Sequence, residues 1–228
     1  MQASTKIIPN PYSEAASFRD GNYQFNFSSC LKWLEKTGKK VFGSHFSISR
    51  EDHELIFKLL VYAIGDKDCC RQRGISLRKG ILLIGPIGCG KTSLISLVNN
   101  FFPVEKQFQM KSSREISFEF EKEGYKLINR YGNSFVHSFG GRFKSGIICF
   151  DDLGIEQVQK YYGNECNVMA EILLSRYDLF VQRKIVTHAT TNLSASELET
   201  LYGNRVRSRM REMFNLIAFD KESIDKRK

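Results

Sequence analysis

The sequence lacks several features that define common protein classes. Among its 6 cysteines no pair has CxxC spacing, and no cysteine–histidine cluster has the spacing of a zinc site. No run approaches the roughly 18 apolar residues that a membrane helix needs, and the N-terminus has no apolar signal core. Only 4 residues are proline and 17 are glycine, which excludes a collagen-like or low-complexity chain. We therefore expect a reduced, soluble protein of the cytoplasm.

The composition is that of a folded protein with a basic surface. Of the 228 residues 42% are hydrophobic, and 18 Phe and 9 Tyr are among them, which excludes disorder throughout. This length suits one domain, or one domain with a modest extension. The 34 Lys and Arg outweigh the 25 Asp and Glu, so the formal net charge is +9. Such an excess suits a polyanion such as nucleic acid, although a basic surface without a dedicated partner is an equal alternative.

Short apolar runs alternate with segments of helical periodicity. The runs lie at residues 81–84, 108–110, 147–150, 185–190 and 216–219. This alternation predicts an α/β fold with a parallel sheet and helices on both faces. We expect an N-terminal arm or flank over 1–48, a core over 49–220 and a charged, frayed tail over 221–228. Within the core we expect a polar loop over 66–79 and one helix over 114–131.

The first motif is Gly-Pro-Ile-Gly-Cys-Gly-Lys-Thr, which matches GxxxxGK[ST] in full. A predicted strand precedes it and a predicted helix follows, as a phosphate-binding loop requires. Glycines let the backbone N–H groups converge on phosphate oxygens, and the helix dipole adds to the attraction. Lys91 would contact the β- and γ-phosphates, and the Thr92 hydroxyl would coordinate Mg²⁺. The predicted nucleotide-binding residues are Gly85, Pro86, Ile87, Gly88, Cys89, Gly90, Lys91, Thr92 and Ser93.

Polar residues end two further predicted strands. Asp151 and Asp152 follow the apolar run 147–150, at the sheet edge where ligands of open α/β sheets bind. Asp151 is suited to hold Mg²⁺ through water, and Asp152 to orient and polarise the attacking water. Asn192 would hydrogen-bond a γ-phosphate or that water, or else cap the next helix, a role for which Ser194 competes. His188, within the preceding strand, is interpreted as structural.

An arginine-rich segment follows near the end of the core. The segment 204–211 holds four arginines, and Arg205 and Arg209 share one helix face because they are four residues apart. A basic helix face is ordinarily solvated. An arginine offered to the γ-phosphate of a neighbouring subunit, however, raises hydrolysis by about 10³–10⁵. That interpretation requires an oligomer.

Together these motifs resemble those of AAA+ ATPases. GPIGCGKT, FDDLG, TTN and YGNRVRSRMREMF occur in that order between Leu77 and Phe219. Within the superfamily they resemble the DnaC-type bacterial helicase loaders and the IstB-type transposition ATPases. The resemblance implies a P-loop NTPase fold with strand order 5-1-4-3-2. It also implies Asp151 and Asp152 as Walker B, Asn192 as sensor 1 and Arg209 as an arginine finger acting in trans, with Arg205 as its companion.

The resemblance further implies ATP and Mg²⁺ as cofactors, self-association through the ATP site, and binding of single-stranded DNA. A replicative helicase or a transposase is the implied partner. The resemblance implies no association with a membrane. No C-terminal helical lid is expected, because little sequence follows Arg209. Basic candidates for DNA contact, with solvated surface charge as the alternative, are Lys106, Lys111, Arg114, Arg142 and Lys144.

The predicted function is that of an ATP-hydrolysing, helicase-loader-like factor in DNA replication. Alternatives are an IstB-like ATPase that assists a transposase, and a nucleotide-gated binding module with little turnover. A small-molecule kinase is disfavoured, because such enzymes usually carry an arginine-bearing lid and the sequence shows no such segment.

Overall fold

A five-stranded parallel sheet forms the centre of the molecule, in a computed structural model that describes residues 8–132, 136–139, 142–156, 158–161 and 164–227. The strands lie in the order β11-β3-β10-β7-β4, and every neighbouring pair is parallel. Their bounds are β3 Gly80–Ile84, β4 Gln109–Ser112, β7 Ile148–Leu153, β10 Thr187–Thr191 and β11 Phe214–Ala218. Numbered along the chain this order is 5-1-4-3-2, so the predicted sheet is confirmed.

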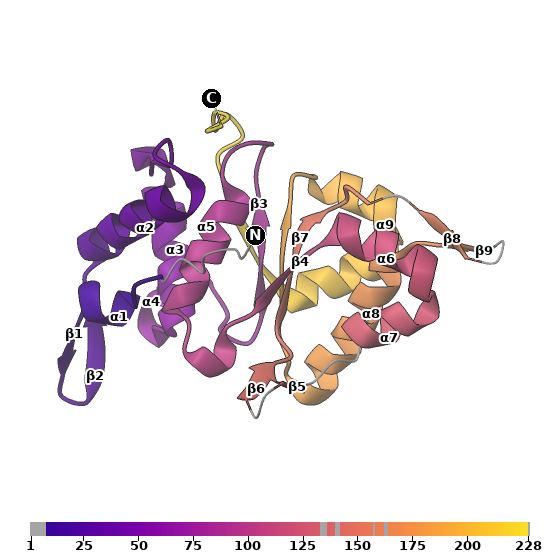
Figure 1. Cartoon of the computed structure of the whole chain (residues 1–228), viewed down its shortest axis with the longest axis horizontal. Coiled ribbons are helices and arrows are strands. Elements are labelled where there is room, and N and C mark those ends of the chain that lie inside the picture. The colour runs from indigo at the N-terminus through magenta and orange to yellow at the C-terminus, as the bar shows by residue number, and fades with distance from the viewer. Residues whose placement is uncertain (1–7, 133–135, 140–141, 157, 162–163, 228) are drawn as a thin grey trace, which may run out of the picture.

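Helices cover both faces of the sheet (Figure 1). One face carries α2 (Phe27–Phe42), α3 (His53–Ile64) and α5 (Lys91–Val98), and the other carries α6 (Ser113–Glu123), α7 (Tyr125–Gly132), α8 (Val168–Arg183) and α9 (Ala195–Met213). Along β3, Ile81 and Leu83 belong to the first core cluster and Leu82 to the second. This alternation is the period of two that a strand buried on both faces requires.

The N-terminal segment packs closely on the first face. It contains α1 (Pro11–Glu14) and a hairpin of β1 (Ala16–Arg19) and β2 (Asn22–Phe25), followed by α2. Trp33 and Leu34 of α2 are buried in the same cluster as α3 and α5, and the Trp33 ring lies 5.1 Å from the Phe101 ring. Side chains before and after residue 48 therefore share one core. The predicted boundary between an arm or flank over 1–48 and a core over 49–220 stays a prediction.

Two local expectations are wrong. The expected loop over 66–79 contains a short helix, α4 (Lys67–Gln72), which begins because the Asp66 side chain accepts a hydrogen bond from the Cys69 N–H. The expected single helix over 114–131 is divided into α6 and α7 at Gly124, whose φ is 57°. A side chain at Gly124 would also collide with the ring of Tyr161.

The remaining described elements are short. Three single-turn helices, η1 (Arg50–Asp52), η2 (Asn99–Phe101) and η3 (Val104–Lys106), accompany two hairpins, β5 (Val136–Phe139) with β6 (Arg142–Ser145) and β8 (Gln159–Tyr161) with β9 (Asn164–Cys166). All six cysteines are free thiols. None of the helices among the described residues is long and apolar enough to span a bilayer.

Candidate nucleotide-binding site

The loop between β3 and α5 encloses one side of a cavity of about 320 Å³. Gly88 and Gly90 have φ values of 84° and 96°, a region that favours glycine, and these conformations turn the loop into the first residue of α5. The cavity is lined by Ile87, Gly88, Gly90, Lys91, Thr92, Ser93, Asp152, Ile155, Asn192 and Arg227. The structure thus brings together predicted residues from three separate segments of the chain.

The other three predicted loop residues form the base of the loop. The Gly85 N–H donates to the Thr191 carbonyl at 3.3 Å, which ties the loop to the end of β10. Cys89 is fully buried, and burial raises the pKa of its thiol. The carbonyls of Gly85 and Pro86 accept hydrogen bonds from the Lys91 ammonium, each at 2.9 Å. Two backbone carbonyls of the loop therefore stabilise the positive charge of the buried Lys91.

Thr92 and Asp151 join the two halves of the site. The Thr92 hydroxyl lies 2.9 Å from Asp151 Oδ1 and 3.0 Å from Oδ2. Hydroxyl and carboxylate oxygens are suitable ligands for Mg²⁺. In nucleotide sites this ion is usually held by one or two such protein ligands, several waters and the phosphates of the substrate. Within the described part of the chain no three His, Cys, Asp or Glu side chains gather as a metal-binding group. The pair fits a magnesium site of that open kind.

Thr190, on the neighbouring strand β10, holds both carboxylate residues in place. Its hydroxyl donates to Asp151 Oδ1 at 2.7 Å and accepts from the Asp152 N–H at 2.8 Å. Sequence reasoning named the strand but missed this residue. The signal was its position two residues before Asn192, because parallel strands that end together place their last residues side by side.

Asp152 has an unusual backbone and a perturbed carboxyl group. Its φ is 55°, a conformation that few residues other than glycine adopt and that is concentrated at functional sites. Burial, and then the charge of Asp151, raises the pKa of Asp152, while Lys91 and Arg227 act in the opposite direction. Raised carboxyl pKa values are typical of residues that exchange protons with substrate or water.

Asn192 lines the cavity and does not cap a helix. The cap of α9 is Ser194, whose hydroxyl accepts from the Glu197 N–H while the Glu197 carboxylate accepts from the Ser194 N–H. This reciprocal pair leaves the Asn192 side chain available to the cavity. The alternative role that the sequence left open is thereby resolved in favour of Ser194.

Neither Arg205 nor Arg209 lines this cavity. Arg209 of α9 packs over the Tyr177 ring, 4.4 Å from its centre, and pairs with Glu212 at 3.3 Å. Its Nη1 also donates to the Tyr177 hydroxyl at 3.2 Å, and Arg205 is exposed on the same helix. Tyr177 of α8, which the sequence did not single out, thus holds Arg209, which does not line the chain's own nucleotide cavity.

The basic candidates for DNA contact whose side chains are described have different surroundings. Lys111 on β4 approaches the Tyr131 ring at 5.9 Å, and Arg114 on α6 lies 5.3 Å from the Phe118 ring. Lys106 lines a different cavity at the opposite edge of the sheet. The side chains of Arg142 and Lys144 lie outside the described part of the structure.

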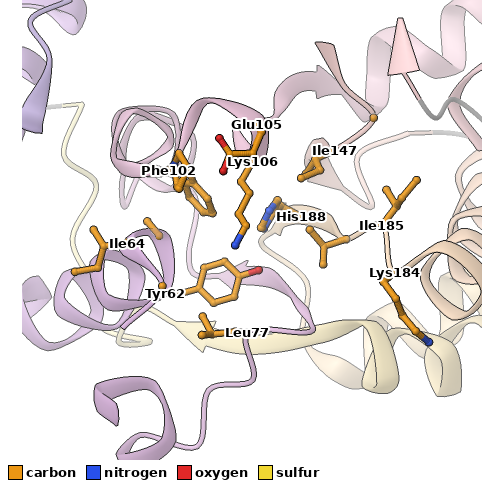
Figure 2. Close-up of a pocket in the computed structure, with 15 residues that line it drawn as sticks. Tyr62, Ile64, Leu77, Phe102, Glu105, Lys106, Ile147, Lys184, Ile185 and His188 are labelled. Atoms are coloured by element: carbon orange, nitrogen blue, oxygen red, sulfur yellow. The ribbon is translucent and has the colours of Figure 1, made fainter. Parts of the chain in front are cut away.

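That second cavity, of about 460 Å³, lies at the amino-terminal ends of the strands (Figure 2). Tyr62, Phe102 and His188 turn their side chains toward it. His188 Nδ1 accepts from the Ile81 N–H at 3.1 Å, and burial, followed by the charge of Arg176, lowers the pKa of His188 to about 3. His188 is therefore a neutral, structural residue, as interpreted from the sequence. None of the predicted nucleotide-binding residues lines this cavity.

The fold and the loop define a P-loop nucleotide-binding protein. The family described as "ATPase family associated with various cellular activities (AAA)" matches residues 81–216, which is more than half of the chain. The chain therefore belongs to the AAA family.

Two solved structures show the same fold. The DnaC helicase loader superposes with a TM-score of 0.51 at 17% identity, covering 78% of this chain and 94% of that one. DnaI gives a TM-score of 0.51 at 17% identity, covering 78% of this chain and 89% of that one.

A sequence relative is known from a virus. Uncharacterized protein R776 of Acanthamoeba polyphaga mimivirus is 36% identical over 52 residues, which are 23% of this chain and 17% of that protein. The chain thus spans less than a fifth of the length of this relative.

Proposed function

We propose that this AAA protein binds and hydrolyses ATP with Mg²⁺ at the cavity beside the β3–α5 loop. The observation that carries the proposal is the direct contact between Thr92 and Asp151. These residues lie far apart in sequence and on different elements, yet they meet at the mouth of the phosphate-binding loop. Thr92 and Asp151 would hold a bound Mg²⁺, which would neutralise negative charge on the phosphates.

The protein's own groups divide the remaining work. Lys91 exchanges the carbonyls of Gly85 and Pro86 for phosphate oxygens, and the N–H groups at the start of α5 add to phosphate binding. Asp152 orients the attacking water and accepts its proton, and its raised pKa favours that transfer. Asn192 hydrogen-bonds the same water or the γ-phosphate.

Hydrolysis is completed between subunits in this proposal. Arg209 lies outside the chain's own cavity, so it reaches a γ-phosphate only across an interface with a second copy. Arg205 accompanies it on the same helix. The protein therefore self-associates through the ATP site, and its turnover depends on concentration.

We further propose that the client is a DNA-replication machine, which the protein loads or remodels in the cytoplasm. The support is the fold shared with the DnaC helicase loader, together with the net charge of +9, which favours binding of a nucleic acid, here proposed to be single-stranded DNA. Lys111 and Arg114 are described side chains suited to a phosphate backbone, and the exposed Phe118 ring beside Arg114 is suited to a stacked base. An IstB-like partnership with a transposase uses the same site with a different client.

The test is the ATPase rate measured against protein concentration, with and without single-stranded DNA and with and without Mg²⁺. We expect a rate that needs Mg²⁺, rises more steeply than linearly with protein, and increases with DNA. Nucleotide binding without turnover under all these conditions would favour a nucleotide-gated binding module. A rate linear in protein and indifferent to DNA would contradict the assembly and DNA parts of the proposal.

A further inference from the structure

The C-terminal segment 221–227 runs back to the phosphate-binding loop. In Figure 1 the C-terminus lies at the same end of the sheet as the loop between β3 and α5. The Lys226 N–H donates to the Gly88 carbonyl at 3.0 Å, and the Lys226 ammonium forms an ion pair with the buried Asp52 carboxylate. It also lies 5.2 Å from the Phe219 ring centre. Lys226 thus attaches the segment that was expected to fray, through three contacts of this one residue.

This attachment places two charged groups beside the phosphate-binding loop. Arg227 lines the nucleotide cavity, together with Lys91 and Asp152. The Asp225 carboxylate lies against Gly88, since a side chain at Gly88 would collide with it. Arg227 and Asp225 pair with each other, with Nε–Oδ1 at 3.1 Å and Nη2–Oδ2 at 3.3 Å.

The Arg227–Asp225 pair lies beside the phosphate-binding loop, where the protein favours a bound anion. The loop N–H groups, the start of α5 and Lys91 all attract negative charge there. Asp225 brings a carboxylate to that place, and Arg227 neutralises it. The Arg227 side chain is 63% exposed, and an exposed ion pair of this kind contributes little to stability. A guanidinium also matches phosphate in the two-point geometry that it uses with a carboxylate.

We propose that Arg227 is a nucleotide-binding residue that recognises the terminal phosphate of ATP within its own subunit, and that Asp225 occupies Arg227 until the nucleotide arrives. This inference rests on the ATP binding proposed above. Arg227 and Asp152 line the same cavity, and Asp152 is the residue to which the proposed function assigns the attacking water, so we expect the guanidinium to meet the terminal phosphate. It therefore contributes more to binding of ATP than of ADP.

The proposal predicts opposite effects for two residues of one short segment. Arg227→Ala removes a phosphate ligand, so we expect ATP affinity to fall about tenfold and ADP affinity by much less. Asp225→Asn removes the competing charge, so we expect ATP affinity to rise severalfold. Lys221→Ala is the matched control, because Lys221 is an exposed cation of the same segment that does not line the cavity.

Isothermal titration of the full chain with ATP and with ADP, both with Mg²⁺, measures these changes directly. We expect ATP affinity to be highest in Asp225→Asn, equal in wild type and Lys221→Ala, and lowest in Arg227→Ala. The same differences should be much smaller for ADP. Unchanged ATP affinity in Arg227→Ala, or equal losses for ATP and ADP, would overturn this inference while wild-type binding upholds the proposed ATP site. A wild-type protein that binds no ATP would overturn both.

Discussion

Thr190 and Asp151 join neighbouring strands of the sheet through one hydrogen bond, in which the Thr190 hydroxyl lies 2.7 Å from Asp151 Oδ1. The same hydroxyl accepts the Asp152 N–H at 2.8 Å. One side chain, fully buried and away from the cavity lining, therefore fixes the positions of two carboxylate residues. Such outer partners usually have large effects on metal binding and rate.

Replacement of Thr190 by valine tests this arrangement. Thr190→Val keeps the shape but loses the hydroxyl, so we expect ATP turnover to fall by about 10- to 100-fold while the protein stays folded. Thr190→Ser retains the hydroxyl and should retain most of the rate. Titration with Mg²⁺ would separate a change in metal affinity from a change in maximal rate. Equal rates for the valine and serine variants would contradict the positioning role.

Asp152→Asn tests the proposed proton acceptor. The amide keeps the size of the side chain but cannot take a proton from water, so we expect turnover to fall by at least about 100-fold. Binding of ATP should persist, because Lys91, Thr92 and the loop backbone are untouched. The measurement is single-turnover hydrolysis beside equilibrium ATP binding on one preparation. Turnover at the wild-type rate would remove Asp152 from this role.

The trans action of Arg209 can be tested by mixing subunits. We expect Arg209→Ala to bind ATP normally but to lose concentration-dependent hydrolysis. Lys91→Ala should lose phosphate binding yet retain its arginine. Mixed assemblies then restore hydrolysis, because each intact ATP site receives Arg209 from a Lys91→Ala neighbour. No recovery at any mixing ratio, with both proteins folded, would argue against action across an interface.

His188 gives the stability a defined dependence on pH. Its pKa is about 3 in the folded protein, against an ordinary value of 6.5. Between these values the unfolded chain holds the extra proton, so stability rises with pH through this window and is lost toward acid, by up to about 1.4 kcal/mol per pH unit. His188→Asn keeps an acceptor for the Ile81 N–H but does not titrate.

Denaturant unfolding of both proteins between pH 5 and 8 measures this slope. We expect the wild-type free energy of unfolding to decline below about pH 6.5 more steeply than that of His188→Asn. The comparison concerns slopes, so a constant loss of stability in the variant does not affect it. Parallel curves would show that His188 is not the titrating group.

Leu34→Ala tests how far the N-terminal segment belongs to the ATPase core. Leu34 is fully buried against that core, so we expect its truncation to cost about 2–5 kcal/mol in one cooperative transition. Phe18→Ala is the control, because Phe18 is 64% exposed on the β1–β2 hairpin and its loss should change stability by about 0.5 kcal/mol or less. A neutral Leu34→Ala would support the division after residue 48.

The sheet and the nucleotide loop were predictable because their signals are local. The strands β3 and β7 contain short apolar runs whose residues are buried on both faces of the sheet, and the loop between Ile84 and Lys91 follows a fixed spacing of glycines. The same strands carried the polar residues of the site to one edge, since parallel strands end on the same side. Asp152 and Asn192 therefore meet at the cavity that the sequence predicted.

The contacts that escaped prediction are those without a local signal. Apolar spacing continues on both sides of Gly124, so only its backbone conformation and the nearby Tyr161 ring reveal the break between α6 and α7. The residues of 221–227 are mostly charged, and charge alone does not indicate which loop they contact. The Lys226–Asp52 pair joins residues 174 positions apart, a separation that periodicity does not report.

Gly203 divides α9 between its capped start and its arginines. Its φ of 82° and ψ of 162° are open essentially to glycine alone, although no heavy atom lies within 4 Å of where a Cβ would be. The position thus has space for a small side chain, but its backbone conformation is one that only glycine adopts without strain. A substitution there would meet no neighbouring side chain but would strain the backbone, so the placement of Arg205 and Arg209 relative to the capped start of α9 depends on the Gly203 torsion angles.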